Sequence, residues 1–248
     1  AFAAGADIVE IDVHPTTDGK WAVFHDWTLD CRTDGTGPTR GHSMAELKAL
    51  DIGYGYSADD GATFPFRGTG IGQMPSLAEV MAAFPDRQFL INFKSNDPAE
   101  GEAFLAALDA HPDWLAQIWG VYGGTRPTDI VRTGSNLPGF TRDSVKACLV
   151  PYLAQGWTGL PPDACHGTMM MVPLNYRRLL WGWPHRYTAR MNSVGSTVVL
   201  IGSLSAGDPG TDGIDTPEAL AKVPARFTGY VWTNKIEQIG PMLRPEID

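Results

Sequence analysis

Short apolar runs separated by segments of helical periodicity recur along the whole chain. Many of these runs are continuous and rich in β-branched or aromatic residues, which is typical of strands buried on both faces of a sheet. Strands that alternate with helices in this way predict an α/β fold with a mainly parallel sheet. We expect strands over residues 6–13, 22–25, 89–94, 119–123, 169–173, 197–202 and 229–233.

Capping residues mark where several helices begin. Ser43 and Ser76 are each followed three positions later by a glutamate, which is the pattern of a capping box. Thr216 precedes a proline that suits the first position of a helix. No internal repeat, low-complexity tract or linker interrupts the chain, so we expect a single domain over residues 1–248. Longer helical patterns cover residues 99–111, 143–155 and 176–192.

The length of 248 residues fits one (β/α)8 barrel, also called a TIM barrel. Only about seven strands are evident, and residues 1–5 have the pattern of a helix end. We therefore expect that the first strand and most of its helix precede Ala1. Residues 27–75 form a long Gly- and aromatic-rich insertion with one short helix, which we expect to lie over the C-terminal face of the barrel.

Composition excludes several classes of protein. Hydrophobic residues make up 43% of the chain, with 8 Trp, 7 Tyr and 10 Phe, which excludes a disordered or fibrous protein. The net charge of −9 and the lack of a dense basic run exclude a nucleic-acid binder. No apolar stretch approaches the roughly 18 residues of a membrane helix. The acidic balance also suits a protein that concentrates a divalent cation.

The three cysteines, Cys31, Cys148 and Cys165, have no metal-binding CxxC spacing. Two alternatives remain open. In an oxidising compartment Cys148 pairs with Cys165, which leaves Cys31 for a residue upstream; otherwise all three are unrelated buried thiols. The sequence does not fix the compartment, and our expectation is a secreted or periplasmic protein.

Two carboxylates share one face of the first expected strand. Glu10 and Asp12 are two positions apart, so both side chains point the same way. Like charges about 7 Å apart are costly unless a cation lies between them, and Mg²⁺ and Ca²⁺ prefer carboxylate oxygens. The pair therefore predicts a metal site. The alternative is an exposed strand end with arginine partners.

Other strands carry candidate site residues near their ends. His25 directly follows an apolar strand, where an imidazole suits a general acid or base, although a packed or capping histidine is the commoner case. Asn92 and Lys94 share a strand face, and Lys94 suits a phosphate or a carboxylate cluster unless it is solvated past the strand. Trp232 either walls a substrate pocket or fills the barrel. The other histidines show no ligand spacing.

Several motifs resemble the signature of the glycerophosphodiester phosphodiesterase family in order and spacing. The resemblance implies a (β/α)8 barrel, a Ca²⁺ or Mg²⁺ ion, and two histidines that act as acid and base or nucleophile. By position, Glu10 and Asp12 would bind the metal, His25 would be the second histidine, and Lys94 would contact the phosphate. The motifs are residues 5–13, 17–19 and 23–26, then Leu29, Arg32-Thr33 and Gly35, with looser similarity at 75–80, 92–94 and 229–234.

The chain departs from the family pattern in two places. The first histidine of the family, in a His-Arg-Gly motif with a glutamate shortly after it, is absent. Asn92 stands where a third acidic metal ligand is usual; an amide oxygen still coordinates, but with one negative charge fewer. We therefore expect these 248 residues alone to be inactive, and a longer native chain to carry the missing histidine.

The reaction that the resemblance implies is hydrolysis of a small glycerophosphodiester to an alcohol and glycerol phosphate. Two alternatives stay open. One is a sphingomyelinase D-like or phosphatidylinositol-cleaving phosphodiesterase with transient membrane or lipid contact, for which Trp181 and Trp183 are candidate contacts. The other is a barrel that binds a phosphorylated ligand without catalysis, which is consistent with Asn92.

Overall fold

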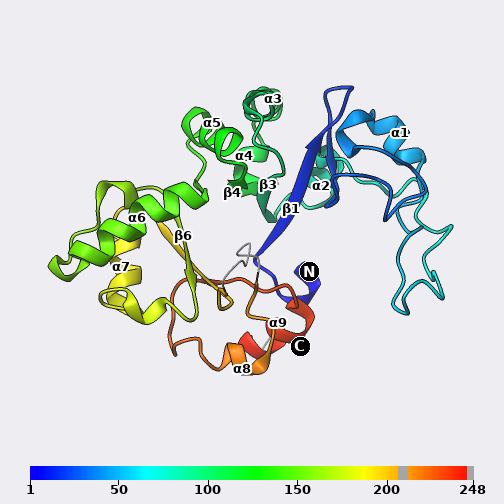
Figure 1. Cartoon of the computed structure of the whole chain (residues 1–248). Helices are drawn as coiled ribbons and strands as arrows, with labels where there is room; N and C mark the ends of the chain where they lie inside the picture. Colours follow the sequence, from blue (N-terminus) through cyan, green and yellow to red (C-terminus); the bar gives the residue numbers. More distant parts are fainter. Residues whose placement is uncertain (206–211, 245–248) are drawn as a thin grey trace. The chain divides into compact units, whose positions relative to one another are not determined.

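The computed structural model describes residues 1–205 and 212–244 of the chain (Figure 1). The chain forms two compact units, one of residues 10–137 and the other of residues 1–9 together with 138–248. Within the described residues, no helix combines the length and the apolar character needed to cross a membrane.

The unit of residues 10–137 is built on strands paired in the order β2-β1-β3-β4. Strands β3 and β4 run parallel, as the alternation of strands and helices predicts. Strands β1 and β2 instead form an antiparallel hairpin, in which Val13 lies opposite Val23. The strands are β1 (Ile8–Pro15), β2 (Trp21–Val23), β3 (Gln88–Phe93) and β4 (Ile118–Gly123).

The expectation that residues 22–25 form a separate strand of a parallel sheet, ending at His25, is therefore wrong. The turn between β1 and β2 is only residues 16–20, whereas a parallel connection needs a crossover of about a dozen residues or more. Gly19 takes a positive φ of 73° in this turn. β2 ends at Val23, so His25 lies in the loop beyond it.

The helices of this unit confirm the capping predictions. Ser43 and Ser76 each accept the backbone N–H of the glutamate three residues on, and that glutamate accepts the N–H of the serine in return. Helix α3 packs against α5, where Gly101 approaches Pro127 so closely that a side chain would not fit. The helices are α1 (Met44–Ala49), α2 (Leu77–Ala83), α3 (Pro98–Ala110), α4 (Trp114–Gln117) and α5 (Thr125–Ser135), with a 3-10 turn, η2 (Thr39–Gly41).

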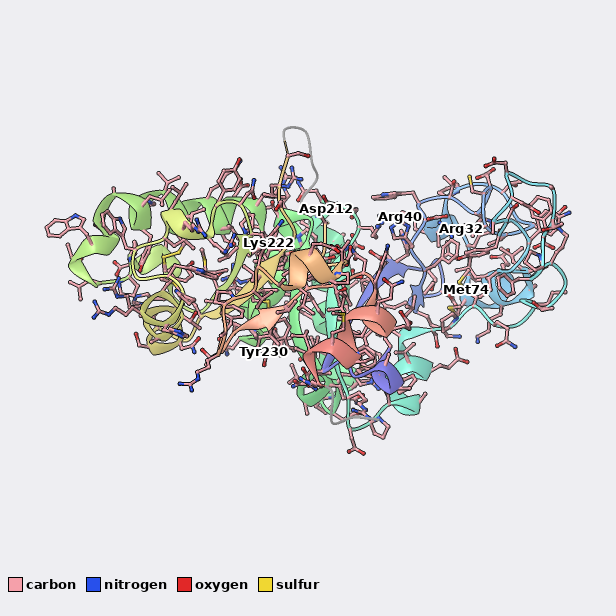
Figure 2. The ribbon with its side chains drawn as sticks, turned by 90° about the horizontal axis from the view of Figure 1, so that it is seen from below. Arg32, Arg40, Met74, Asp212, Lys222 and Tyr230 are labelled. Atoms are coloured by element: carbon pink, nitrogen blue, oxygen red, sulfur yellow. A yellow bond between two sulfur atoms is a disulfide. The ribbon has the colours of Figure 1, made fainter. Side chains whose placement is uncertain are left out.

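Residues 27–75 form a packed segment with a small core of its own. Leu29, Leu47 and Met74 are fully buried there, together with Ala22 of β2. The Asp51 carboxylate accepts the backbone N–H groups of three glycines of the segment, at 3.0, 2.6 and 2.9 Å, which ties together stretches far apart in sequence. Figure 2 labels Arg32, Arg40 and Met74 in this part of the chain. Its predicted place over a barrel face stays a prediction.

The second unit contains a parallel sheet in the order β6-β7-β8. The core beside this sheet includes Tyr152 and Tyr187, both fully buried. Its strands are β5 (Gly139–Phe140), β6 (Met169–Pro173), β7 (Thr197–Ile201) and β8 (Tyr230–Val231). Its helices are α6 (Arg142–Gln155), α7 (His185–Ser193), α8 (Pro217–Leu220) and α9 (Ile236–Leu243), with 3-10 turns η1 (Phe2–Ala4), η3 (Gly156–Thr158), η4 (Asp163–Cys165) and η5 (Arg177–Leu179).

The helix expected over residues 176–192 is interrupted. The structure has the turn η5 and then α7, which begins only at His185. Gly182 has a φ of 83° and Pro184 has no N–H to donate, so a continuous helix cannot pass through this segment.

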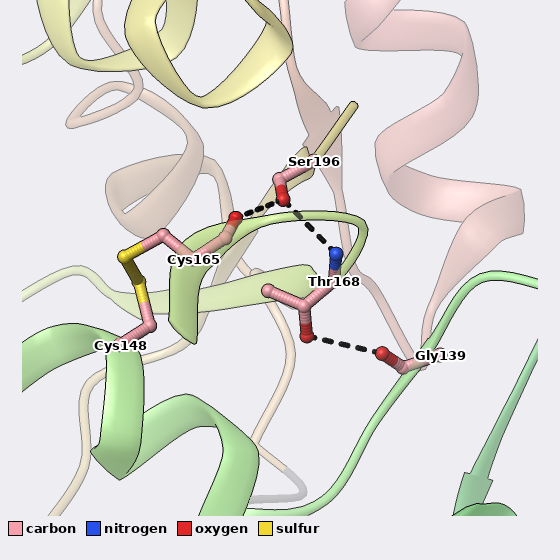
Figure 3. The surroundings of a disulfide bond; sticks show 5 residues. All are labelled: Gly139, Cys148, Cys165, Thr168 and Ser196. Atoms are coloured by element: carbon pink, nitrogen blue, oxygen red, sulfur yellow. Dashed lines mark hydrogen bonds between the residues drawn. A yellow bond between two sulfur atoms is a disulfide. The ribbon is translucent and has the colours of Figure 1, made fainter. Parts of the chain in front are cut away.

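A disulfide joins Cys148 of α6 to Cys165 of η4, as the first of the two alternatives for the cysteines predicted (Figure 3), whereas a partner of Cys31 upstream stays a prediction. Cys31 is exposed and unpaired in the structure. Beside the bridge, Ser196 Oγ donates to the backbone oxygen of Cys165 and accepts the Thr168 N–H at 3.0 Å. These bonds fix the chain that leads into β6.

The strand and helix content of both units confirms the α/β class. Three expectations stay predictions: that the strands close into one (β/α)8 barrel, that a first strand precedes Ala1, and that the chain forms a single domain.

Candidate active site

Two neighbouring strands, β1 and β3, bring four of the predicted site residues together. Glu10 and Asp12 lie two positions apart on β1 and so share one of its faces. Asp12 Oδ1 is 2.8 Å from Asn92 Nδ2 of β3 and 3.2 Å from Lys94 Nζ, which lies just past the end of β3. Lys94 is thus not a solvated strand-end residue, since only 14% of its side chain is exposed. The prediction that these residues converge is supported by contacts between strands 80 residues apart in sequence.

Tyr122 of β4 is a further member of this cluster that the sequence did not reveal. Its hydroxyl donates a hydrogen bond to Glu10 Oε1 at 2.9 Å. Burial, and then the charge of Glu10, raises the pKa of Tyr122 well above its usual range, so the phenol stays a proton donor. A single tyrosine in a strand carries no sequence signal that separates it from a core residue.

Glu10 is the carboxylate with the most strongly shifted ionisation in this cluster. Burial, and then the charge of Asp12, raises the pKa of Glu10 to about 7, against the opposing effects of the Tyr122 hydrogen bond, Lys94 and Asn92. Near neutral pH this carboxyl group is therefore close to half protonated, and a bound cation would compete with its proton.

The donor set of the cluster fits a magnesium-type site better than an all-protein cage. Mg²⁺ is commonly held by one or two carboxylates plus the phosphate of a substrate. Glu10 and Asp12 can supply the carboxylates. Among the described residues, no group of three or more His, Cys, Asp or Glu side chains is arranged to hold a metal. Asn92 directs its NH₂ group at Asp12, so its role as a third ligand stays a prediction that needs its amide to rotate.

His25 lies in the loop after β2, next to the β1 strand that carries the carboxylates. The backbone N–H of Phe24 donates to the Asp12 carbonyl at 3.1 Å, which places His25 one residue beyond that pairing. His25 Nδ1 is 2.7 Å from Asp26 Oδ1, and 73% of the His25 side chain is exposed. A carboxylate at Nδ1 favours the proton on that nitrogen and leaves Nε2 for a substrate.

Asp26 is itself held by Arg32, whose Nε lies 3.1 Å from Asp26 Oδ2. Partial burial alone would raise the pKa of Asp26, but the His25 hydrogen bond and the Arg32 charge together lower it below its usual range. Asp26 is therefore ionised at neutral pH and can orient the imidazole of His25.

His14 is a buried imidazole on β1 whose position the sequence patterns did not predict. Its side chain shares the β1 face of Glu10 and Asp12, because β1 extends to Pro15 rather than ending at residue 13. The ring is fully buried, packs edge-on against Trp27 at 5.7 Å, and neither of its nitrogens has a hydrogen-bond partner. Burial, followed by the charge of Arg40, lowers the pKa of His14 to about 4. The spacing of two between residues 10, 12 and 14 could have predicted that His14 shares a strand face with the two carboxylates.

Arg40, which is partly exposed, and the buried Glu100 form an ion pair near His14. Arg40 lies over the Trp27 ring at 4.7 Å, and its NH2 is 3.8 Å from Glu100 Oε1. Burial raises the pKa of Glu100 above its usual range, while Ser95 and Arg40 oppose the shift. This pair had no motif in the sequence.

Trp232 follows β8 in the other compact unit. Its backbone N–H donates to the Leu200 carbonyl at 2.9 Å, which continues the pairing of β8 with β7. Trp232 is half-buried. Asp215 accepts bonds from Thr233 and Asn234, which fixes the chain just after Trp232. The role of Trp232 as a substrate contact stays a prediction.

Comparison with known proteins gives matches in the first half of the chain. Residues 1–119 match the model of the glycerophosphoryl diester phosphodiesterase family. A glycerophosphodiester phosphodiesterase of Bacillus subtilis is 34% identical over 109 residues, which is 43% of this chain and 37% of the relative. One from Caldanaerobacter subterraneus is 36% identical over 94 residues, 38% of this chain and 35% of the relative. The chain thus spans little more than a third of these curated relatives.

Similarity to solved structures extends over nearly the whole chain. The glycerophosphoryl diester phosphodiesterase domain of a Mycobacterium tuberculosis protein has a TM-score of 0.73 at 16% identity, covering 98% of this chain and 90% of that one. A glycerophosphodiester phosphodiesterase of Agrobacterium tumefaciens has a TM-score of 0.66 at 20% identity, covering 96% and 89%. A phosphodiesterase of Oleispira antarctica, solved with its product sn-glycerol-3-phosphate, has a TM-score of 0.50 at 18% identity, covering 80% and 73%. At these identities the likeness concerns the fold.

Proposed function

We propose that the chain belongs to the glycerophosphoryl diester phosphodiesterase family, whose model matches residues 1–119, and that the protein hydrolyses small glycerophosphodiesters to an alcohol and glycerol phosphate. The observation that carries this proposal is the joining of Glu10, Asp12 and Lys94 in one polar cluster, with the pKa of Glu10 raised to about 7. Two carboxylates beside a lysine suit a cation and a phosphate together. The relative solved with sn-glycerol-3-phosphate supports a phosphorylated glycerol as the ligand.

In this proposal Glu10 and Asp12 hold Mg²⁺ or Ca²⁺, with Asn92 as a weaker third ligand. The bound ion supplies positive charge at the phosphoryl oxygens. Lys94, which lies 3.2 Å from Asp12, adds a fixed ammonium group beside the same phosphate. Its low exposure limits competition from water for that contact.

His25 is the proposed acid for the leaving group. In the hydrolysis the oxygen of a water forms a new bond to phosphorus while the P–O bond to the alcohol breaks. The leaving alkoxide takes the Nε2 proton of the His25 imidazolium, whose charge Asp26 at Nδ1 stabilises, and the attacking water gives its proton to the second histidine that the resemblance implies as the base. The second histidine that the resemblance implies has no counterpart with the right motif among these 248 residues, so we propose that they bind the ligands without turnover.

Calorimetric titration tests the binding half of the proposal. We expect Mg²⁺ or Ca²⁺ to bind at pH 8, with a loss of at least roughly tenfold in affinity in Glu10→Gln or Asp12→Asn. The exposed Glu102→Gln is the matched control and should bind as the parent does. Unchanged affinity in both cluster variants would remove the metal site from the proposal.

Titration of sn-glycerol-3-phosphate with the metal present tests Lys94. We expect Lys94→Gln to weaken binding roughly tenfold, because it removes a poorly hydrated charge. Lys20→Gln is the control, since the Lys20 side chain is 62% exposed. Equal affinity in Lys94→Gln and the control would contradict the phosphate role.

Phosphorus NMR of glycerophosphocholine tests the chemistry. Clear turnover by these 248 residues with Mg²⁺ or Ca²⁺ would contradict the need for a second histidine. A longer chain that carries the missing histidine should turn over, and unchanged turnover after His25→Ala in that chain would contradict the role of His25 as the acid.

The Cys148–Cys165 disulfide supports an oxidising compartment, because such bonds are rare where thiols are kept reduced. We therefore propose a secreted or periplasmic location. Recovery of the native protein from cytosolic extract with both thiols free would contradict it.

A further inference from the structure

Exposed apolar side chains occur on the second unit, around the C-terminal end of α6 and the turn η5. The tryptophan patch, as we name it, includes two exposed tryptophans, Trp157 at 67% and Trp181 at 47%. Large apolar side chains gathered this openly usually mark an interaction surface. The patch comprises Val150, Leu153, Trp157, Leu160, Leu179 and Trp181.

Direct contacts show that the two halves of the patch meet. Trp181 Nε1 donates to the Leu153 carbonyl at 2.9 Å, which joins the segment after η5 to the end of α6. A Cβ at Gly156 would lie 3.0 Å from the Trp181 ring, so the ring rests on the backbone beside Trp157. Val150, Leu153 and Trp157 follow one another at helical spacing.

The base of the patch is held rigidly. The Tyr152 hydroxyl donates to the Trp181 carbonyl at 2.8 Å, and Arg190 NH1 lies 2.9 Å from the Gly156 carbonyl. The buried Cys148–Cys165 disulfide ties the same helix to η4. The exposed side chains thus project from a fixed backbone, which lowers the ordering cost of binding a partner.

The charge around the patch is opposite to that of the rest of the chain. Residues 142–190 contain six Lys and Arg against two Asp and no Glu, a net charge of +4. The remaining residues contain 13 Lys and Arg against 26 Asp and Glu, a net charge of −13. Lys146, Arg178 and Arg186 are exposed, and in the part of the chain that the structure describes none of them forms an ion pair.

These cations border the apolar side chains. Lys146 lies one helical turn before Val150, and Arg178 is next to Leu179. Arg186 lies close to the backbone next to Trp181, since a Cβ added at Gly182 would be 2.7 Å from Arg186 Cβ. Indole rings and short aliphatic side chains surrounded by lysine and arginine match the boundary between lipid headgroups and acyl chains.

We propose that the tryptophan patch docks the protein on an anionic lipid surface, with Trp157 and Trp181 in the headgroup layer. The net charge of −13 elsewhere repels the same surface, so the charge asymmetry selects this face for contact. The proposal goes beyond hydrolysis and does not depend on the carboxylate cluster.

Co-sedimentation with vesicles tests the docking. We expect the chain to pellet with phosphatidylcholine vesicles that contain phosphatidylglycerol, and to bind at least roughly tenfold more weakly to phosphatidylcholine alone or in high salt. Trp157→Ser combined with Leu160→Ser should lower the first affinity by roughly tenfold or more. Ile71→Ser is the matched control, because Ile71 is 60% exposed in the other unit.

A second variant guards against loss of folding. Arg178→Glu combined with Arg186→Glu should weaken binding to phosphatidylglycerol vesicles and leave the weak binding to phosphatidylcholine unchanged. Equal pelleting of the parent and both double variants would overturn the proposal. A dimer in solution that Trp157→Ser with Leu160→Ser converts to monomer, without vesicle binding by the parent, would assign the patch to a second copy of the chain and also overturn it.

Discussion

The Tyr122 hydroxyl donates a hydrogen bond to Glu10 Oε1 at 2.9 Å, across two strands that are far apart in sequence. This bond stabilises the ionised form of Glu10 and therefore opposes the burial that raises its pKa to about 7. The phenol thus lowers the pKa of Glu10 toward neutrality, which its proposed role as a metal ligand requires because a ligand carboxyl must be deprotonated.

Removing that hydroxyl should weaken metal binding in a pH-dependent way. In Tyr122→Phe the pKa of Glu10 rises further, so we expect roughly a threefold to tenfold loss of Mg²⁺ affinity at pH 7 and a much smaller loss at pH 9. Calorimetric titration at the two pH values measures this, with the part-exposed Tyr56→Phe as control. An equal loss at both pH values would mean that Tyr122 acts by packing alone.

The raised pKa of Glu10 predicts how stability changes with pH in the metal-free protein. Because the folded value of about 7 exceeds the unfolded value near 4.5, the folded state binds the extra proton and stability falls as pH rises from 4.5 to 7. Glu10→Gln should remove this fall and raise the free energy of unfolding at pH 8 by up to about 3 kcal/mol. Urea unfolding from pH 4.5 to 8 measures it, and Glu102→Gln should keep the parent profile.

His14 predicts a change of the opposite sign. The folded pKa of about 4 lies below the unfolded value of 6.5, so its stabilising contribution is complete above pH 6.5 and is lost as pH falls toward 4. His14→Leu should therefore narrow the stability difference between pH 7.5 and pH 5 by roughly 2 kcal/mol. His42→Leu, on a partly exposed histidine, is the control for urea unfolding at both pH values. If His14→Leu leaves the stability difference between pH 7.5 and pH 5 unchanged, the His14 side chain is solvated in the folded protein.

The disulfide should contribute to stability through the chain that it closes. Cys148 and Cys165 are 17 residues apart, and a loop of that size corresponds to about 3 kcal/mol of unfolding free energy. Cys148→Ser combined with Cys165→Ser should show this loss in guanidinium unfolding. Cys31→Ser should stay within about 0.5 kcal/mol of the parent, because Cys31 is exposed and unpaired.

Sequence patterns predicted the elements that carry strong local signals. The capping boxes at Ser43 and Ser76 are present, and the strand over residues 169–173 has the predicted bounds. Helix α5 was missed because Gly124 supplies no side-chain cap and Gly134 and Pro127 weaken the helical pattern. The two-residue strand β5 is too short to show any alternation.

The sequence predicted the site residues whose position depends on a single strand. It did not predict those that join the site through pairing between strands. Spacing alone put Glu10 and Asp12 on one face, and apolar flanks marked Asn92 and Lys94. Tyr122 enters the cluster only because β4 lies beside β3, which no local pattern reports. The amide of Asn92 turns its NH₂ to Asp12, a choice made by that carboxylate rather than by the sequence around residue 92.

Strand β1 serves two partners along its length, since it pairs with β3 in the sheet and with β2 in the hairpin. Asp12 lies where these pairings meet, bonded to Asn92 through its side chain and to Phe24 through its backbone. Insertions or deletions beyond the hairpin can therefore accumulate during evolution without moving the carboxylates. The segment of residues 27–75 can thus vary in length while the strand that carries Glu10 and Asp12 keeps its place.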